Sequence, residues 1–454
     1  MINGGLRNTA RQSSIALGLC LWAFLGAAAQ GKWEQTNILM AGDAAEDDWY
    51  GVAVATTADI VLIGTENTDS SAPITGAAYL VDVLTGQQQH KLIAADVEMM
   101  TLFGNDVAIV GNVAVVGAMA DHDVEFAAGA IYVFDATSAD QLHKLTATDG
   151  GLKDNFGFSV ATDGIVVLGG APNHDAGAED SGAAYLFDLS SGDLLHKLTP
   201  DDPFVDHLFG WDVAVNDDML LVSAIGDASA GENTGAAYLF DVATGAQLHK
   251  LTADDAAEGD LFGYSIALND AVALIGAPDD GDGTDLGAAY IFDLTTGLQI
   301  TKFKSKDGSS GHRFGWSVAM HADLAVAGAT GDYYSRGAAY LFDLSDPAAP
   351  LQVRKFTPRG GLPSDYFGYG VGIGDGVVVV GSPGDDDIAE YAGSAHLFEA
   401  CGADVYGDEM VDVTDLLEIL SLWGTGDVYA DVNGDDIVDV LDLLMVLANW
   451  GPCD

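Results

Sequence analysis

An aromatic-glycine pair recurs along this chain at intervals of 52 or 53 residues. The pairs are Tyr50-Gly51, Phe103-Gly104, Phe156-Gly157, Phe209-Gly210, Phe262-Gly263, Phe314-Gly315 and Phe367-Gly368. Two further markers keep the same register, a Gly-Ala-type pair such as Gly170-Ala171 and a GAAYLFD-type run such as the one that starts at Gly182. Three markers in register predict a protein built from seven copies of one structural unit.

Each unit contains four strand-like segments. In the fifth unit these are residues 264–268, 271–275, 288–293 and 298–303, which are rich in β-branched, aromatic and small apolar residues and are bounded by Gly, Asp and Asn. Helical periodicity is absent from the repeats. Four short antiparallel strands in each of seven units predict an all-β fold, a seven-bladed β-propeller over residues 30–399.

The two ends of the repeat region are complementary. The seventh unit ends at Phe398-Glu399 without a fourth strand, and a lone strand-like segment, residues 33–40, precedes the first aromatic-glycine pair. We expect this segment to complete the last blade as its outer strand, because the closed ring would then have no open sheet edge.

The Phe-Gly and Gly-Ala-Pro markers resemble the FG-GAP repeats of integrin α-subunits and of many exported bacterial proteins, over residues 33–399. The resemblance implies the propeller fold and no single function. Integrin-type repeats carry a calcium loop between the two markers. Here that connection is only Asn269-Asp270 in the fifth unit and Asp163-Gly164 in the third, so those calcium sites are not expected.

The formal net charge of −53 excludes nucleic acid and anionic membranes as partners. Successive strands of a blade run in opposite directions. The loop between strands 2 and 3 (the 2→3 loop) and the loop from strand 4 to the first strand of the next blade (the 4→1 loop) therefore lie on one face. These loops are long and acidic. One interpretation is a calcium-assisted or cation-seeking recognition face that takes a glycan or protein ligand; the favoured alternative is a solvated acidic surface that only maintains solubility. Tyr333, Tyr334 and Trp49 are candidate sugar contacts. A weaker calcium site is predicted at Asp279, Asp280, Asp282 and Asp285.

Neither a histidine metal cluster nor a catalytic motif is predicted. His90, His143, His196 and His249 share one repeat position, so they are expected to be structural strand residues and not a metal cluster. No G-x-S-x-G, H-E-x-x-H, P-loop or Rossmann motif occurs, and no catalytic residue is assigned.

The N-terminus has the pattern of a targeting segment. Arg7 and Arg11 precede an apolar run that ends in three alanines. Residues 1–29 are therefore predicted to be a signal peptide, so that the protein is secreted or held at the cell surface. The alternative, a membrane anchor, is disfavoured because the run is too short to span a bilayer. No later segment is expected to span one.

Residues 400–454 break the repeat with two acidic loops, each followed by an amphipathic segment, residues 416–423 and 443–450. The spacing of oxygen donors matches EF-hand-type calcium loops. The second loop offers Asp431, Asn433, Asp435, the Ile437 carbonyl, Asp439 and Asp442. The first offers Asp404, Asp408, the Met410 carbonyl, Asp412 and Asp415, but has Tyr406 at a ligand position. The alternative is a helical pair without metal.

This module resembles a dockerin, which implies Ca²⁺ as cofactor and a cohesin-like or other extracellular protein as partner. Asp436 and Glu409 stand where glycine is usual in the two loops. Cys401 and Cys453 flank the module and are expected to form a disulfide in an oxidising compartment, the alternative being two free thiols.

The leading hypothesis is an exported, non-enzymatic recognition or adhesion protein. It combines a propeller as the binding scaffold with a calcium-ordered module that docks to a partner protein. Two alternatives remain open. One is a secreted carbohydrate-active enzyme, a hydrolase or lyase, or an accessory subunit of a polysaccharide-degrading complex. The other is a structural protein of the cell envelope.

Overall fold

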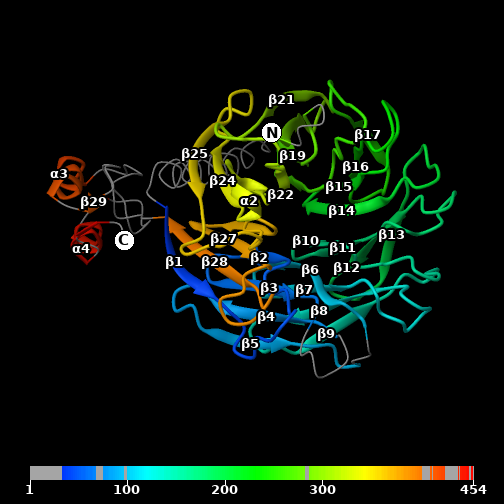
Figure 1. Ribbon diagram of the computed structural model, residues 1–454, viewed down its shortest axis with the longest axis horizontal. Helices are drawn as coiled ribbons and strands as arrows, with labels where there is room; N and C mark the ends of the chain where they lie inside the picture. The colour runs from blue at the N-terminus through cyan, green and yellow to red at the C-terminus, as the bar shows by residue number, and fades with distance from the viewer. Residues whose placement is uncertain are drawn as a thin grey trace, which may run out of the picture. The chain divides into compact units, whose positions relative to one another are not determined.

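Seven four-stranded antiparallel sheets surround a central axis in the computed structural model (Figure 1). The structure describes residues 33–67, 75–96, 100–281, 286–400, 410–411, 413–424, 438, 440–448 and 451–452. Each sheet is one blade, and in the first six blades the strands follow the chain outward from the axis. The predicted seven-bladed β-propeller is therefore confirmed.

The strands occupy four concentric positions. The inner strands are β2 (Val54–Thr56), β6 (Phe103–Val110), β10 (Val160–Thr162), β14 (Phe209–Asn216), β18 (Ile266–Leu268), β22 (Phe314–His321) and β26 (Val371–Gly374). The second strands are β3 (Ile60–Thr65), β7 (Val113–Ala118), β11 (Val166–Ala171), β15 (Met219–Ala224), β19 (Val272–Ala277), β23 (Leu324–Ala329) and β27 (Val377–Ser382). The third are β4 (Ala77–Asp82), β8 (Ala130–Asp135), β12 (Ala183–Asp188), β16 (Ala236–Asp241), β20 (Ala288–Asp293), β24 (Ala338–Asp343) and β28 (Ser394–Ala400). The outer strands are β5 (Gln88–Leu92), β9 (Gln141–Leu145), β13 (Leu194–Leu198), β17 (Gln247–Leu251), β21 (Gln299–Phe303), β25 (Leu351–Phe356) and β1 (Trp33–Leu39).

The ring closes as the sequence predicts. The seventh sheet has the order β1-β28-β27-β26, so the first strand of the chain is the outer strand of the last blade. The Thr36 hydroxyl donates to the Glu399 carboxylate at 2.8 Å beside this pairing. At the inner end of the blades, Tyr50 forms a parallel bridge with Gly393 and joins the seventh blade to the first.

Glycine is required where neighbouring blades touch. The first glycine of the GAAYLFD run bridges to the aromatic residue of the next blade, as in Gly182 with Phe209. Gly182 has a φ of +81°, and a Cβ built there would lie 2.0 Å from the Phe209 carbonyl oxygen. A Cβ on Gly170 of β11 would lie 2.0 Å from the carbonyl oxygen of Gly210. These approaches explain why small residues mark every repeat.

Aromatic pairs fill the space beside these contacts. The repeat phenylalanine packs edge-on against the tyrosine of its own blade's third strand, as in Phe156 with Tyr185 at 5.3 Å between ring centroids. Both side chains are fully buried. In the seventh blade His396 replaces the tyrosine and packs against Phe367 at 5.1 Å. Such pairs add roughly 1 kcal/mol each beyond their burial.

The described residues of 398–454 are grouped with residues 33–36 and 322–324 in a second compact unit. Within it, α3 (Val413–Ser421) contacts α4 (Val440–Ala448), and β29 (Met410–Val411) pairs with β30 (Gly451–Pro452). Each helix begins three residues before the amphipathic segment read from the sequence. A short turn, α2 (Asp332–Ser335), belongs to the 2→3 loop of the sixth blade. No helix in the described ranges is both long and apolar enough to cross a membrane.

Candidate functional site

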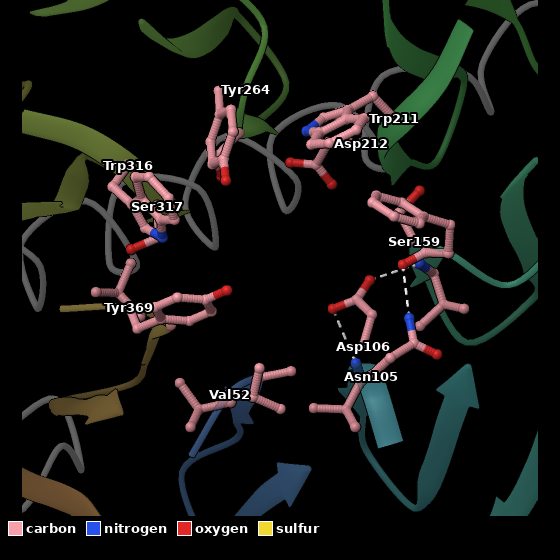
Figure 2. Close-up of a pocket in the computed structure, with 18 of the residues that line it drawn as sticks. Val52, Asn105, Asp106, Ser159, Trp211, Asp212, Tyr264, Trp316, Ser317 and Tyr369 are labelled. Atoms are coloured by element: carbon pink, nitrogen blue, oxygen red, sulfur yellow. Dashed lines mark hydrogen bonds between the residues drawn. The ribbon is translucent and has the colours of Figure 1, made fainter. Parts of the chain in front are cut away.

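A cavity of about 320 Å³ lies on the axis of the propeller (Figure 2). Its wall comes from the residues that directly follow the aromatic-glycine pair in every blade. Because each inner strand begins on the face of the 4→1 loops, the cavity lies towards the acidic face. Glu66 and Met119, which follow second strands and begin 2→3 loops, also line it. A pocket of this size is at the lower end of the range for small-molecule sites.

Five aromatic side chains from successive blades form a continuous arc along the cavity wall. Ring centroids are separated by 4.8 Å for Phe158 and Trp211, and by 5.7 Å for Trp211 and Tyr264. The arc continues with 4.6 Å from Tyr264 to Trp316 and 5.5 Å from Trp316 to Tyr369. Adjacent rings are tilted by 46° to 53°. We call these five residues the aromatic arc.

The polar ends of the aromatic arc are left for a ligand. Figure 2 shows the hydroxyls of Tyr264 and Tyr369 directed into the cavity. Among the described residues, neither hydroxyl forms a hydrogen bond with the chain, and neither does the indole N–H of Trp211 or of Trp316. Partly buried hydrogen-bond donors of this kind normally have an acceptor. Here the acceptor must come from water or from a ligand.

Besides Glu66, two carboxyl groups of the inner strands face the same cavity, Asp106 of β6 and Asp212 of β14. The Asp212 oxygens accept the backbone N–H groups of Val213 at 2.8 Å and of Ile266, in the next blade, at 2.7 Å. Asp106 repeats this arrangement with Val107 and Val160. Burial raises the pKa of Asp106 to about 7 and that of Asp212 to about 8. Both groups therefore hold protons well above the usual range of an aspartic acid.

Replacement of Asp212 by serine should reduce the loss of folding stability between pH 5 and pH 9. The pKa of Asp212 is about 8 in the folded chain and about 4 in the unfolded chain. The stability that this difference contributes is fully present below about pH 4 and is lost as the pH rises through about 8. Serine occupies the equivalent position at Ser317. Between pH 5 and pH 9, urea denaturation should show wild type losing about 1–3 kcal/mol more than Asp212→Ser. Parallel pH profiles for the two proteins would contradict this.

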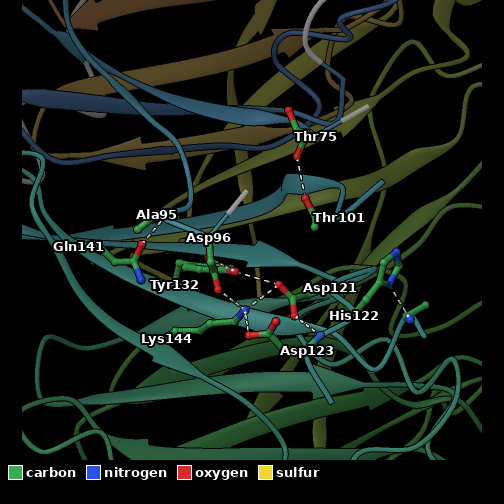
Figure 3. A network of polar contacts seen from close by, with 11 residues as sticks. Thr75, Ala95, Asp96, Thr101, Asp121, His122, Asp123, Tyr132, Gln141 and Lys144 are labelled. Atoms are coloured by element: carbon green, nitrogen blue, oxygen red, sulfur yellow. Dashed lines mark hydrogen bonds and ion pairs between the residues drawn. The ribbon is translucent and has the colours of Figure 1, made fainter. Parts of the chain in front are cut away.

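Some of the acidic loop residues are neutralised within the blades. In six blades of the described chain, a 4→1-loop aspartate accepts hydrogen bonds from a third-strand tyrosine and an outer-strand lysine, a cluster that we call the blade clasp. The clasps are Asp43, Tyr79 and Lys91; Asp96, Tyr132 and Lys144; Asp149, Tyr185 and Lys197; Asp202, Tyr238 and Lys250; Asp255, Tyr290 and Lys302; and Asp307, Tyr340 and Lys355. Their lysines lie 5.0–5.4 Å from the tyrosine ring centroids. Figure 3 shows the clasp of the second blade, where Asp121 and Asp123 also approach Lys144.

Several blades add a buried group to the clasp. In the fourth blade Lys250 lies 2.7 Å from Asp227, which is fully buried, and His207 lies 3.2 Å from the same carboxylate oxygen. In the fifth blade Asp280 pairs with Lys302 at 2.5 Å and Lys304 at 2.8 Å. Part of the negative charge read from the sequence as a recognition surface is therefore paired inside individual blades.

The weaker calcium candidate falls on this same cluster. Asp280 is 3 % exposed and bonded to two lysines, while Asp279 lies 3.4 Å from Arg313. Asp282 and Asp285 lie outside the described residues. No group of three or more His, Cys, Asp or Glu side chains suited to a metal occurs among the residues that the structure describes.

The structure describes little of the predicted C-terminal calcium loops. Met410 lies in β29, Asp415 in α3 and Asp442 in α4. The remaining predicted ligands and both cysteines lie outside the described residues, namely Asp404, Asp408, Asp412, Asp431, Asn433, Asp435, Ile437, Asp439, Cys401 and Cys453. The calcium sites and the disulfide stay predictions.

The repeated histidines and the exposed aromatics lie away from the cavity wall. His90, His143, His196 and His249 each lie on the outer strand of a separate blade. His196 and His249 contact a carbonyl in the 3→4 hairpin of the next blade, at 3.3 Å. Tyr333 and Tyr334 are 69 % and 81 % exposed, and Trp49 stacks on Tyr391 at 5.9 Å.

Comparison with known proteins supports the repeat assignment. The FG-GAP repeat model matches residues 33–81, 87–134, 140–187, 194–240, 246–292, 298–342 and 351–398. The chain belongs to the FG-GAP repeat family. It is also similar to integrin alpha-PS5 of Drosophila melanogaster, with 30 % identity over 193 residues. That similarity covers 35 % of this chain and only 18 % of the length of the integrin.

Sequence reasoning missed the axial site of this FG-GAP propeller. A signal was present, because the residue directly after the aromatic-glycine pair is Phe, Trp or Tyr in five consecutive units, at Phe158, Trp211, Tyr264, Trp316 and Tyr369. These residues lie in or just before the innermost strands of blades that surround one axis. A position repeated there therefore brings its side chains together, whereas a position repeated on the outer strands spreads them apart.

Proposed function

We propose that this FG-GAP protein is an exported recognition protein whose propeller is the binding scaffold. The observation that carries the proposal is the axial cavity, where hydrogen-bonding groups without protein partners surround a space of about 320 Å³. The likeness to an integrin α-subunit is compatible with an extracellular location. The signal-peptide pattern of residues 1–29 supports export.

We propose a binding role without catalysis for the two cavity carboxyl groups. Their raised pKa values would suit acid-base chemistry. However, both oxygens of Asp106 and of Asp212 accept backbone N–H groups, and one oxygen of each carboxyl group accepts its N–H from the next blade. These bonds give each carboxyl group a structural role that accounts for its position.

We also propose that residues 400–454 bind Ca²⁺ and dock to an extracellular protein of the cohesin type. The support is the ligand spacing of the second loop, together with the helices α3 and α4 that follow the two loops. Docking is tested by surface plasmon resonance of the full chain on an immobilised cohesin domain, in calcium and in chelator. Equal responses in the two buffers would exclude calcium-dependent docking.

Calcium titration of the full chain should separate the second loop from the propeller. In isothermal titration calorimetry, Asp431→Asn combined with Asp442→Asn should weaken calcium binding at least tenfold, because two charged ligands are lost from one site. The matched control is Asp279→Asn, which should leave the isotherm unchanged because Asp279 belongs to the weaker candidate. If Asp279→Asn weakened calcium binding and the double variant did not, the calcium site would lie in the propeller and not in the second loop.

A further inference from the structure

We propose that the axial cavity binds a neutral saccharide, of one or two pyranose rings, against the aromatic arc. Its hydroxyls would bond to the polar groups of Trp211, Tyr264, Trp316 and Tyr369. The inference names the ligand class of the recognition role proposed above and rests on that role.

The aromatic arc supplies the apolar half of such a site. A pyranose ring has C–H faces that pack on aromatic faces, and five adjacent rings offer such faces around one curved wall. All five side chains are half-buried, so they contact the cavity and are also held by the blades. The cavity volume of about 320 Å³ admits a small ligand and excludes a folded protein domain.

The hydrogen-bonding groups select against charged ligands. An indole N–H can only donate, so Trp211 and Trp316 require an acceptor, which an ammonium group does not have. An anion would meet the carboxyl groups of Glu66, Asp106 and Asp212 on the same wall. A hydroxyl group both donates and accepts, and therefore suits the indoles, the phenols and the carboxyl groups together.

The carboxyl groups have capacity left for such a ligand. Each oxygen of Asp106 and Asp212 accepts one backbone N–H, and a carboxyl oxygen can accept a second hydrogen bond. Near neutral pH the raised pKa of Asp212, about 8, also leaves a proton to donate. The pair can thus accept from one sugar hydroxyl and donate to another.

The test uses the full chain on a broad array of neutral glycans, followed by calorimetry and tryptophan fluorescence with the saccharide that binds best. Tyr264→Phe, Tyr369→Phe and Trp211→Phe each remove one unpartnered polar group and keep an aromatic ring. Each should weaken binding about fivefold to tenfold, the value of one hydrogen bond. Tyr366→Phe removes a hydroxyl outside the cavity wall and should bind as wild type does.

Three results would overturn the inference. One is an array that retains no neutral glycan. The second is binding that the three cavity variants leave unchanged. The third is a fluorescence response to tetramethylammonium without any response to saccharides, which would assign the cavity to cations. If a cohesin domain or another protein ligand still binds, the recognition role stands and only the ligand class fails.

Discussion

Gly170→Ala should destabilise the propeller by about 3 kcal/mol or more, a large effect for the addition of one methyl group. Gly170 lies in β11, and its new Cβ would be 2.0 Å from the Gly210 carbonyl oxygen and 2.5 Å from the Ser159 hydroxyl. The closer atom belongs to the backbone of the next blade, so no side-chain rotation relieves the clash. The two blades must separate, and both lose packing.

The measurement is urea denaturation followed by tryptophan fluorescence, with Gly177→Ala as the matched control. A Cβ on Gly177 would meet the Pro203 side chain no closer than 3.4 Å, so this variant should unfold within about 0.5 kcal/mol of wild type. Equal midpoints for the two variants would show that the blades can move apart easily, against the packing described above.

Lys250→Met should cost about 3 kcal/mol at pH 7, because it leaves a buried charge without its cation. Lys250 lies 2.7 Å from Asp227, whose side chain is fully buried, and 2.6 Å from the half-exposed Asp202. Burial alone would raise the pKa of Asp227, but hydrogen bonds from His207 and Lys250 hold that pKa well below its usual range. After the substitution Asp227 keeps contacts with the His207 ring, the Ser229 N–H and the Tyr238 hydroxyl, but it loses the lysine ammonium.

Lys91→Met is the matched control, since Lys91 occupies the same repeat position but pairs with Asp43, which is 53 % exposed. It should cost less than about 1 kcal/mol. The depressed pKa of Asp227 stabilises the folded chain above the unfolded pKa, about 4, and this contribution is lost as pH falls. The deficit of Lys250→Met should therefore shrink between pH 7 and pH 3. A deficit independent of pH would point to lost packing instead.

The ring of blades could be predicted from the sequence because its markers are local and repeated. Glycine is required where two backbones approach closely, and glycine therefore occurs at Gly182 and at the equivalent position of the other units. The closing strand could also be predicted. The seventh unit lacks a fourth strand and a lone strand precedes the first unit, so the lone strand is expected to complete the seventh sheet. Both predictions are confirmed by the order β1-β28-β27-β26.

The loops were harder to interpret, because a carboxylate looks the same in the sequence whether or not it has a partner. Asp202 and Asp255 belong to the loops predicted as a recognition face, and the structure pairs them with Lys250 and Lys302. Those lysines lie 47 or 48 residues away along the chain. Only the fold brings them together, so the charge balance of the face could not be read locally.

Residue type, spacing and repetition thus determined the architecture of this protein: seven sheets, their glycine contacts and the strand that closes them. Only the tertiary structure decided where its polar groups are satisfied. Hydrogen-bond and ion-pair partners come from distant strands. They pair a loop aspartate in each of six blades, and in the described chain they leave the polar groups of the aromatic arc without a partner. The physical reason is that a hydrogen bond depends on distance in space, which the order of residues does not contain.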